Sequence, residues 1–350
     1  MLRRRGEAGL GLGMMRIMAA VLMVGAVTAA GAQTPAAGGA NGARSAAAGS
    51  SQKPTPAPQL NSLPPTGTPD PFPQPNLKNF TASTPTVATV DAFLKQLWGY
   101  DANRIWRVEA ITTTQAPGVT RVVVFVSDKS PNAKVQTSAF FVTPDGKHAI
   151  AGDGVVAFGS TPFAESRQIL QNRADGPARG AVGKELMLVE FADMECPHCK
   201  EVQGTMDQLV KDFPKARVVY QNFPLTEIHP FAFKAAADGV CVAKQKPEAF
   251  WTYLQAVYDT QGGLTEESGE VTLNNAVRKA GLDPATVELC AATPATKANV
   301  DASLKLGEGV GVDQTPMLAV NGHLLPLSAA MPYETLKSIV AYQAAEDGVR

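Results

Sequence analysis

A pair of cysteines placed between a short apolar segment and an amphipathic helix constrains the fold of this chain more than any other feature. Residues 186–191 are apolar apart from Glu190, which is the pattern of a buried strand. The motif Cys196-Pro197-His198-Cys199 comes next, and a helix follows with apolar side chains on one face. These are Val202, Met206, Leu209, Val210 and Phe213. A second strand at 218–220 completes a β-α-β order, which predicts an α/β domain with a parallel pair of strands.

The chain after this unit is expected to leave the sheet for a helical stretch and then return to it. Helices are predicted at 230–243, 247–258, 273–280 and from Pro284 onward, where Asp283 is the capping residue. The dipeptide Asn321-Gly322 between apolar segments favours a hairpin of 317–320 and 323–327. A last helix is predicted at 333–343.

Cys196 lies where a strand gives way to a helix, so its sulfur is expected at the helix N-terminus. Unpaired backbone N–H groups and the helix dipole stabilise a thiolate there, and His198 adds a donor or a positive charge. A stabilised thiolate makes the oxidised Cys196–Cys199 pair ready to accept electrons by thiol–disulfide exchange. The other interpretation of a CxxC motif is a zinc site, but zinc needs four ligands and the sequence has no second CxxC or HxxxH. We therefore expect redox chemistry without a metal or an organic cofactor.

The segment from Glu190 to Cys199 resembles the active-site segment of the DsbA-like branch of the thioredoxin superfamily, which has the same CPHC motif. The similarity covers about 186–343. It continues through Phe223-Pro224-Leu225, Ile228-His229-Pro230, Gly311-Val312, Thr315-Pro316 and the Asn321-Gly322 hairpin. This resemblance implies an α/β class protein whose residues 178–346 have a thioredoxin fold, with a helical insertion at about 228–305.

The resemblance also implies roles for single residues. A cis peptide bond between Thr315 and Pro316 would face the cysteines, and the Thr315 backbone would pair with an extended substrate. Glu190 would be a buried carboxylate that exchanges a proton with Cys199, and Pro197 would be preorganised for the first helical turn. The glycines between 307 and 311 are interpreted as a flexible approach to the cis proline.

Two features predict that the Cys196–Cys199 disulfide is a weaker oxidant than the disulfides of the most oxidising members of this family. Asp193 and Glu195 place carboxylates close to Cys196, and a nearby negative charge raises a thiol pKa. Thr315 before the cis proline is more typical of thioredoxin-like and isomerase members. The direction of electron flow is therefore left open by the sequence.

Cys241 and Cys290 fall in two different predicted helices. In an exported protein two such thiols most simply pair, and related exported members have cysteines in similar places. We expect a structural disulfide that closes a loop of the insertion; two inert thiols or an electron relay are the alternatives.

The N-terminus predicts export. Arg3, Arg4, Arg5 and Arg16 precede the apolar segment 17–27, and Ala30-Gly31-Ala32 is a small-x-small cleavage pattern. Residues 1–32 are predicted to be a cleaved signal peptide rather than a membrane anchor, because the apolar segment is short against the ~20 residues that span a bilayer. Residues 33–86, rich in Ala, Gly and then Pro, are predicted to be a linker. The mature protein is then expected in the periplasm or outside the cell.

Residues 87–170 are predicted to form a small α+β domain. Val90, Phe93, Leu94 and Leu97 recur at helical spacing, and 121–126, 137–142 and 148–158 have the pattern of strands. The segment 141–152 resembles the last hairpin of the dimerisation domain of the DsbC and DsbG isomerases. This resemblance raises the alternative of a dimeric isomerase or reductase.

From these features the sequence predicts an exported thiol:disulfide oxidoreductase that introduces disulfides into other exported proteins. It would need cysteine-containing substrates and a partner that reoxidises or reduces the site. A second alternative is a peptide-binding or chaperone module in which the CxxC motif is incidental. The formal net charge of −1 argues against a nucleic-acid partner.

Overall fold

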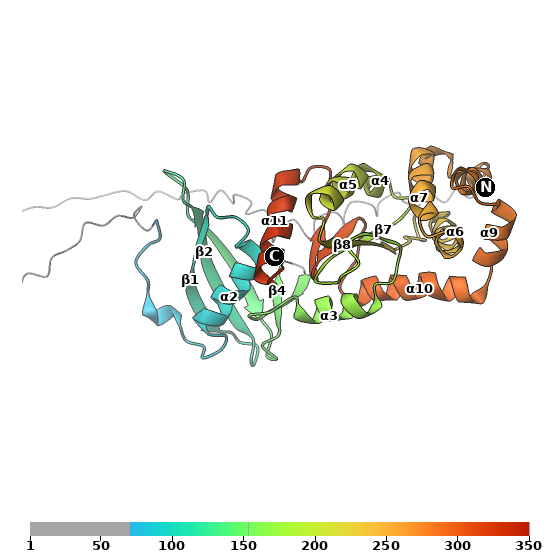
Figure 1. Ribbon diagram of the computed structural model, residues 1–350. Coiled ribbons are helices and arrows are strands. Elements are labelled where there is room, and N and C mark those ends of the chain that lie inside the picture. The colour runs from blue at the N-terminus through green and yellow to red at the C-terminus, as the bar shows by residue number, and fades with distance from the viewer. Residues whose placement is uncertain (1–70, 153, 350) are drawn as a thin grey trace, which may run out of the picture.

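The computed structural model describes residues 71–152 and 154–349 (Figure 1). The expected signal peptide and the linker up to residue 70 lie outside the described residues. The described part contains two five-stranded sheets, one in each half of the chain. Figure 1 shows the first sheet at one end of the molecule, the second in the middle and a group of helices at the other end.

The first sheet is antiparallel and has the order β1-β2-β3-β4-β5. Its strands are β1 (Arg104–Thr113), β2 (Thr120–Asp128), β3 (Gln136–Val142), β4 (His148–Ala151) and β5 (Gly154–Ala157). Helix α2 (Val87–Trp98) begins at the capping residue Thr86 and packs Val90, Phe93 and Leu94 against one face of this sheet. The packing matches the predicted periodicity of the helix.

Two details of the first sheet differ from the sequence prediction. The predicted strand 148–158 is a hairpin of β4 and β5, because Gly152 has a positive φ and turns the chain back. Because apolar residues lie on both sides of that turn, the sequence analysis interpreted 148–158 as one strand. Strand β1, which the sequence analysis did not assign, pairs with β2 along most of its length.

Residues 71–86, placed in the linker by the sequence analysis, lie against this first domain. A short helical turn, η1 (Leu77–Asn79), is followed by Phe80, which pairs with Ile111 and packs on the core. The Thr84–Pro85 peptide bond is cis. After β5, helix α3 (Ala164–Arg173) leads to the second domain and buries Leu170 against its sheet.

The second sheet has the order β10-β9-β7-β8-β6. Its strands are β6 (Ala178–Gly180), β7 (Leu186–Ala192), β8 (Ala216–Asn222), β9 (Met317–Val320) and β10 (His323–Pro326). Strands β7 and β8 are parallel, whereas β9, β10 and β6 pair antiparallel. The predicted β-α-β unit and the Asn321-Gly322 hairpin are present; the three-residue strand β6 was not foreseen.

Helices cover both faces of this sheet. Helix α4 (Pro197–Glu201) and helix α5 (Gln203–Asp212) follow β7, and α5 packs with α11 (Tyr333–Glu346) on one face. Helices α3 and α10 (Pro294–Gly309) pack on the other face. The result is a three-layer α/β/α domain whose central strand, β7, is buried at every residue.

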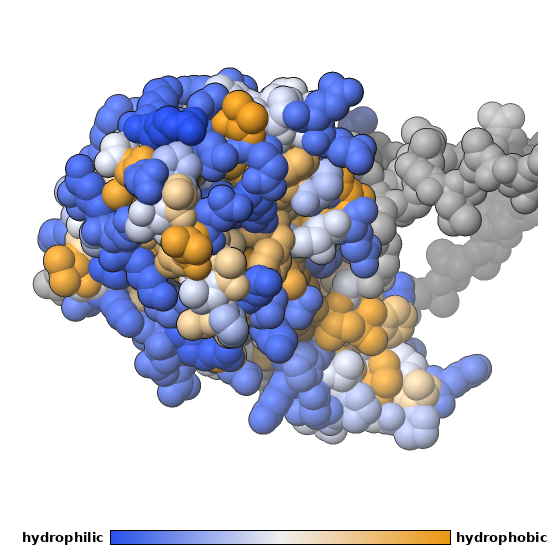
Figure 2. Space-filling view, turned by 90° about the vertical axis from the view of Figure 1, so that its right-hand side faces the viewer, coloured by the Kyte–Doolittle hydropathy of each residue, from blue (hydrophilic) through white to orange (hydrophobic). Residues whose placement is uncertain are grey.

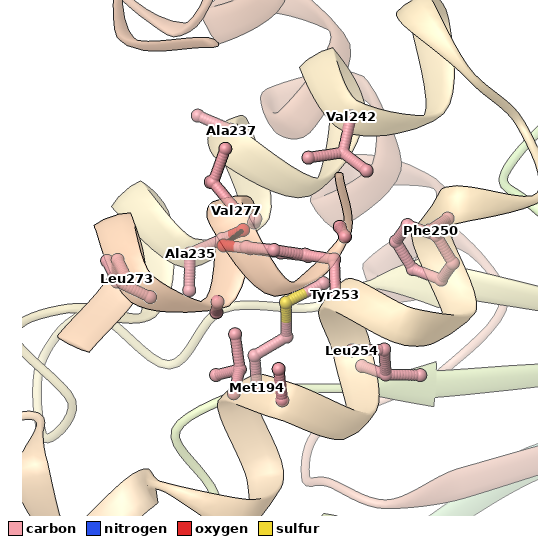
Figure 3. Packing of buried hydrophobic residues seen from close by; sticks show 14 of the residues in the cluster. Met194, Ala235, Ala237, Val242, Phe250, Tyr253, Leu254, Leu273 and Val277 are labelled. Atoms are coloured by element: carbon pink, nitrogen blue, oxygen red, sulfur yellow. Dashed lines mark hydrogen bonds between the residues drawn. The ribbon is translucent and has the colours of Figure 1, made fainter. Parts of the chain in front are cut away.

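The helical stretch between β8 and β9 forms the insertion. Its elements are α6 (Ala232–Gln245), α7 (Ala249–Asp259), η2 (Gln261–Gly263), α8 (Gly269–Lys279) and α9 (Pro284–Ala291). Figure 3 shows the insertion's own core, in which Met194 from the active-site loop reaches Ala235, Tyr253 and Leu273. Helix α10 then runs back beneath the sheet (Figure 1).

The glycines near 307 are not a flexible approach to Pro316, contrary to the sequence prediction. Gly307 and Gly309 belong to the last turn of α10, and Gly307 lies against Phe191 and Phe223, where a larger residue would not fit. Gly307 is therefore a packing residue. Helix α10 ends at Gly309 with Val310 as its C-cap residue, and Gly311 just beyond has a φ of 93°, a conformation common after a helix end.

The two domains contact each other through α11. Lys95 of α2 pairs with Glu346 at 3.1 Å, and the Tyr342 hydroxyl donates to the Lys95 carbonyl. Within the second domain, Arg167 of α3 pairs at 2.7 Å with Asp347, the C-cap residue of α11. On the helical end of the molecule, Figure 2 shows mostly hydrophilic side chains with small, separate apolar patches. Within the described residues no helix has the length and apolarity that crossing a membrane requires.

Candidate active site

Strand β7 and helix α4 place the two cysteines of the motif. The buried strand ends at Ala192, a tight loop follows, and the Cys196 N–H donates to the Asp193 carbonyl at 3.2 Å. Cys196 is the N-cap residue of α4, with Pro197 in the first turn, as predicted for a sulfur at a helix N-terminus. Cys196 and Cys199 are both buried, and both are free thiols in the structure.

The surroundings divide the two sulfurs into a thiolate and a thiol. A hydrogen bond from Cys199 lowers the pKa of Cys196 to about 5, helped by Thr315 and by the backbone N–H groups of Cys199 and His198 and opposed by burial. Burial and the nearby Cys196 thiolate raise the pKa of Cys199 well above its ordinary value. At neutral pH the negative charge therefore resides on Cys196, the cysteine nearer the surface.

His198 is exposed and turned toward Glu201, with 3.0 Å between Nδ1 and Oε2. That carboxylate is the main reason why the pKa of His198 is raised. The imidazole adds only a weak positive field at Cys196, and the backbone N–H of His198 acts on the sulfur.

Asp193 and Glu195 do not act on Cys196 as the sequence analysis expected. The Asp193 carboxylate is fully buried and accepts from the backbone N–H groups of Glu195 and Leu225 and from His229. Glu195 turns to the start of α6 and accepts from the Phe231 N–H at 2.6 Å. Neither carboxylate is among the largest causes of the Cys196 pKa shift, and both accept hydrogen bonds from other donors.

Glu190 lies in the middle layer, buried on β7. Burial raises its pKa to about 7, and a hydrogen bond from Gln203 opposes the rise. The Gln203 side-chain amide donates to Glu190 at 2.7 Å and to the Cys199 carbonyl at 3.0 Å. Gln203 thus joins the carboxyl to the residue that carries the buried sulfur.

Thr315 and Pro316 face the cysteines from the loop before β9. Their peptide bond is cis, as the resemblance implied, and the Cys196 Sγ lies 3.8 Å from the Thr315 carbonyl oxygen. The Thr315 hydroxyl is buried beside the two sulfurs and, as a donor, lowers the pKa of both. A strand-like substrate would compete for the same carbonyl group.

The sequence analysis missed three residues that hold this loop in place. Gln261 of η2 donates to the carbonyls of Met194 and Cys196 at 2.9 and 3.0 Å, and Met194 is embedded in the insertion core (Figure 3). Gln203 is the third. Gln261 is 65 residues from Cys196, so no local pattern could have indicated it.

An open hollow of about 690 Å³ lies beside Pro197. Its walls come from the active-site loop and helix α4 on one side and from the insertion on the other. They are formed by Glu195, Pro197, Lys200, Glu201, His229, Gln261 and Gly262. The hollow therefore adjoins the residues on either side of Cys196 in the chain, Glu195 and Pro197.

Cys241 of α6 and Cys290 of α9 form a disulfide, with 5.9 Å between their Cα atoms. The Thr296 hydroxyl lies 3.5 and 3.7 Å from the two sulfurs. This pair belongs to the insertion core and is separate from the reactive pair. In the described part of the chain, no cluster of three or more His, Cys, Asp or Glu side chains is arranged to hold a metal ion.

Comparison with known proteins gives the family of the second domain. A family model described as Thioredoxin matches residues 174–341. The match indicates that this part of the chain is a thioredoxin-like domain. The predicted family and fold class are confirmed.

Similarity to individual proteins is more limited in length. The Na(+)/H(+) antiporter NhaA 3 of Salinispora tropica is 37% identical over 73 residues, which are 21% of this chain and 11% of the antiporter. The probable disulfide bond formation protein D of Bacillus anthracis is 30% identical over 122 residues, which are 33% of this chain and 52% of that protein. The chain therefore spans about half or less of these relatives.

Among solved structures, ScsC of Proteus mirabilis in a transitional conformation is 25% identical. The match covers 53% of this chain and 78% of that chain, with a TM-score of 0.45.

Proposed function

We propose that the DsbA-like domain is a thiol:disulfide oxidoreductase that introduces disulfides into exported proteins. The observation that carries this proposal is the thiolate on Cys196, whose pKa is lowered to about 5. Such a thiolate stabilises the reduced pair, which makes the oxidised pair a good electron acceptor. Cys199 and Glu190 complete the site, and Thr315 and Pro316 would hold the substrate.

The exchange proceeds in two balanced steps. A substrate thiolate attacks the Cys196 Sγ, the Cys196–Cys199 bond breaks, and its electron pair goes to Cys199, which takes a proton. A second substrate thiol loses its proton and attacks the substrate sulfur of the mixed disulfide, releasing Cys196 as a thiolate. The substrate gains a disulfide and the enzyme becomes a dithiol, so a redox partner must reoxidise it.

We propose that the protein is exported, in accord with the expected signal peptide. Export fits the activity because disulfides persist outside the cytoplasm. The Cys241–Cys290 bridge of the insertion supports the same compartment. The substrates would be exported polypeptides with free cysteine thiols, bound in extended form along Thr315 and the hollow beside Pro197.

A dimeric isomerase or reductase is the second candidate, and the first domain gives an observation in its favour. Phe141, Ile150 and Val155 are neighbours across β3, β4 and β5 and are exposed, Val155 at 65%. An exposed apolar row on a sheet is suited to self-association. Sedimentation of the full chain and of an Ile150→Lys variant would detect such a dimer, and refolding of a scrambled substrate would detect isomerase activity.

A redox titration in glutathione buffers tests the main proposal. We expect the Cys196–Cys199 pair to equilibrate with glutathione at a potential well above that of the glutathione pool. A value near the roughly −270 mV of thioredoxin would support a reductase instead. Peptide binding that persists unchanged in a Cys196→Ser, Cys199→Ser double variant without any exchange activity in the wild type would favour a binding module.

A further inference from the structure

His229 and Asp193 form a hydrogen-bonded pair between the active-site loop and the insertion. The distance from His229 Nδ1 to Asp193 Oδ2 is 2.8 Å, and the Asp193 side chain is completely buried. A carboxylate only accepts hydrogen bonds, so the Nδ1–H of the imidazole is the donor. The pair is shielded from water, since the His229 side chain is only 16% exposed.

The Asp193 side chain is held by donors from three positions of the chain. Its Oδ1 accepts from the Glu195 N–H, and its Oδ2 accepts from the Leu225 N–H, each at 2.8 Å, in addition to His229. A buried carboxylate needs such partners because each lost donor leaves part of its charge uncompensated. His229 is the one side-chain donor in this set.

The backbone of Asp193 contacts both reactive cysteines. Its N–H donates to the Cys199 Sγ at 3.4 Å, and its carbonyl accepts from the Cys196 N–H at 3.2 Å. The Cys199 sulfur is the leaving group when a substrate attacks Cys196, so negative charge develops on it in the transition state. A donor held in place where charge develops lowers the barrier.

We propose that His229 is a positioning residue: through the Asp193 carboxylate it keeps the Asp193 N–H aimed at the Cys199 sulfur and so speeds attack on the disulfide. The inference rests on the proposed thiol:disulfide exchange and deepens it. His229 belongs to the first segment of the insertion. The insertion would therefore influence the rate of exchange as well as form one wall beside the active-site loop.

Two substitutions at His229 separate positioning from proton transfer by the ring. Asparagine can place a side-chain N–H close to the position of Nδ1, whereas alanine cannot. The measurement is the second-order rate constant for reduced glutathione attacking the oxidised full chain. We expect His229→Ala to react about tenfold more slowly, because the donor is displaced rather than lost, and His229→Asn to return to within about threefold of the wild type.

His148→Ala is the matched control. His148 also pairs with an aspartate through Nδ1, at 2.7 Å from Asp145, but on the exposed hairpin of the first domain. We expect this variant to react at the wild-type rate. A His229→Ala rate within threefold of the wild type, or a His229→Asn rate as low as that of alanine, would overturn the positioning role.

The same experiment keeps this inference apart from the function on which it rests. If the oxidised wild type and His148→Ala do not react with glutathione, the proposed exchange fails and the role of His229 fails with it. If they react and the reaction is lost in Cys196→Ser, the exchange stands, and the His229 variants alone decide the positioning role.

Discussion

The two cysteines of the CPHC motif differ because one sulfur is stabilised as an anion while its neighbour is not. The hydrogen bond from Cys199 is the largest cause of the low Cys196 pKa, ahead of Thr315 and the backbone donors. The sequence analysis assigned this stabilisation to the helix N-terminus and to His198. The helix does contribute donors, but the imidazole is turned toward Glu201, a preference that no pattern in the motif indicates.

Removing Cys199 should therefore move the pKa of Cys196. In the reduced wild type we expect the ultraviolet absorbance of the thiolate to titrate with a pKa of about 5. In Cys199→Ala the pKa should rise toward the ordinary thiol value, because the main donor is gone. An unchanged pKa in Cys199→Ala would show that the remaining donors are sufficient.

Glu190 should lower stability at alkaline pH. Burial raises its pKa from 4.5 to about 7, so the cost of ionising it in the fold is absent below pH 4.5 and complete above pH 7. We expect Glu190→Gln to raise the free energy of unfolding by roughly 3 kcal/mol at pH 8, the cost of a pKa raised from 4.5 to about 7, and to leave it unchanged at pH 4. Urea unfolding at both pH values measures this; an equal gain at both would contradict it.

At the scale of elements, most of the second domain follows from its sequence pattern. Strand β7, the amphipathic helix, the inserted helices and the hairpin lie where apolar periodicity and turn residues predicted them. The pattern failed in two places. Strand β6 is too short to show periodicity. Gly307 was interpreted as flexible because its packing partners, Phe191 and Phe223, are distant in sequence. The contact of Gln261 with the active-site loop was beyond prediction for the same reason.

Asn321 does more than form a turn. Its φ is 46°, as the predicted hairpin requires, but its buried side chain also accepts from the Met187 N–H and donates to Glu185 and Asp347. We expect Asn321→Gly, which keeps the turn, to lose about 2–3 kcal/mol in denaturant unfolding, because buried polar groups lose their partners.

Asn132 provides the control for that prediction. It also has a positive φ, 65°, but lies exposed in a loop of the first domain. Asn132→Gly should leave stability nearly unchanged. Equal effects at Asn132 and Asn321 would mean that the turn conformation alone accounts for Asn321.

The disulfide of the insertion should add stability independently of the reactive pair. Cys241 and Cys290 are 49 residues apart, and closing a loop of that length is worth roughly 4 kcal/mol on the chain-entropy model, with smaller values common. In a Cys196→Ser, Cys199→Ser background, a reductant should therefore lower Tm. The same treatment should have no effect once Cys241 and Cys290 are also replaced by Ala, whereas an unchanged Tm in the first background would contradict the prediction.

At the scale of the whole molecule, the junction between the domains was not predictable. Lys95 is about 250 residues away in sequence from Tyr342 and Glu346, and the three form no motif, yet they join α2 to α11. Gly99 permits this contact, since a Cβ atom there would overlap the Tyr342 hydroxyl.

A methyl group at Gly99 should loosen the two domains without affecting the chemistry. We expect Gly99→Ala to be cleaved faster in limited proteolysis between the domains, near residues 158–163, while its rate with glutathione stays at the wild-type value. Gly154→Ala, where the nearest atom allows ordinary contact, is the control. A slower glutathione reaction in Gly99→Ala would show that the junction influences the cysteines.

The Lys95–Glu346 pair joins the two domains next to Asp347, which Asn321 links to the beginning of β7, whereas Cys196 follows the end of that strand. Seven residues of strand separate the two places by about 20 Å. A polypeptide that docks on the Cys196 sulfur would therefore contact the helical insertion and not the first domain. A large, partly folded polypeptide would then bind without any separation of the two domains.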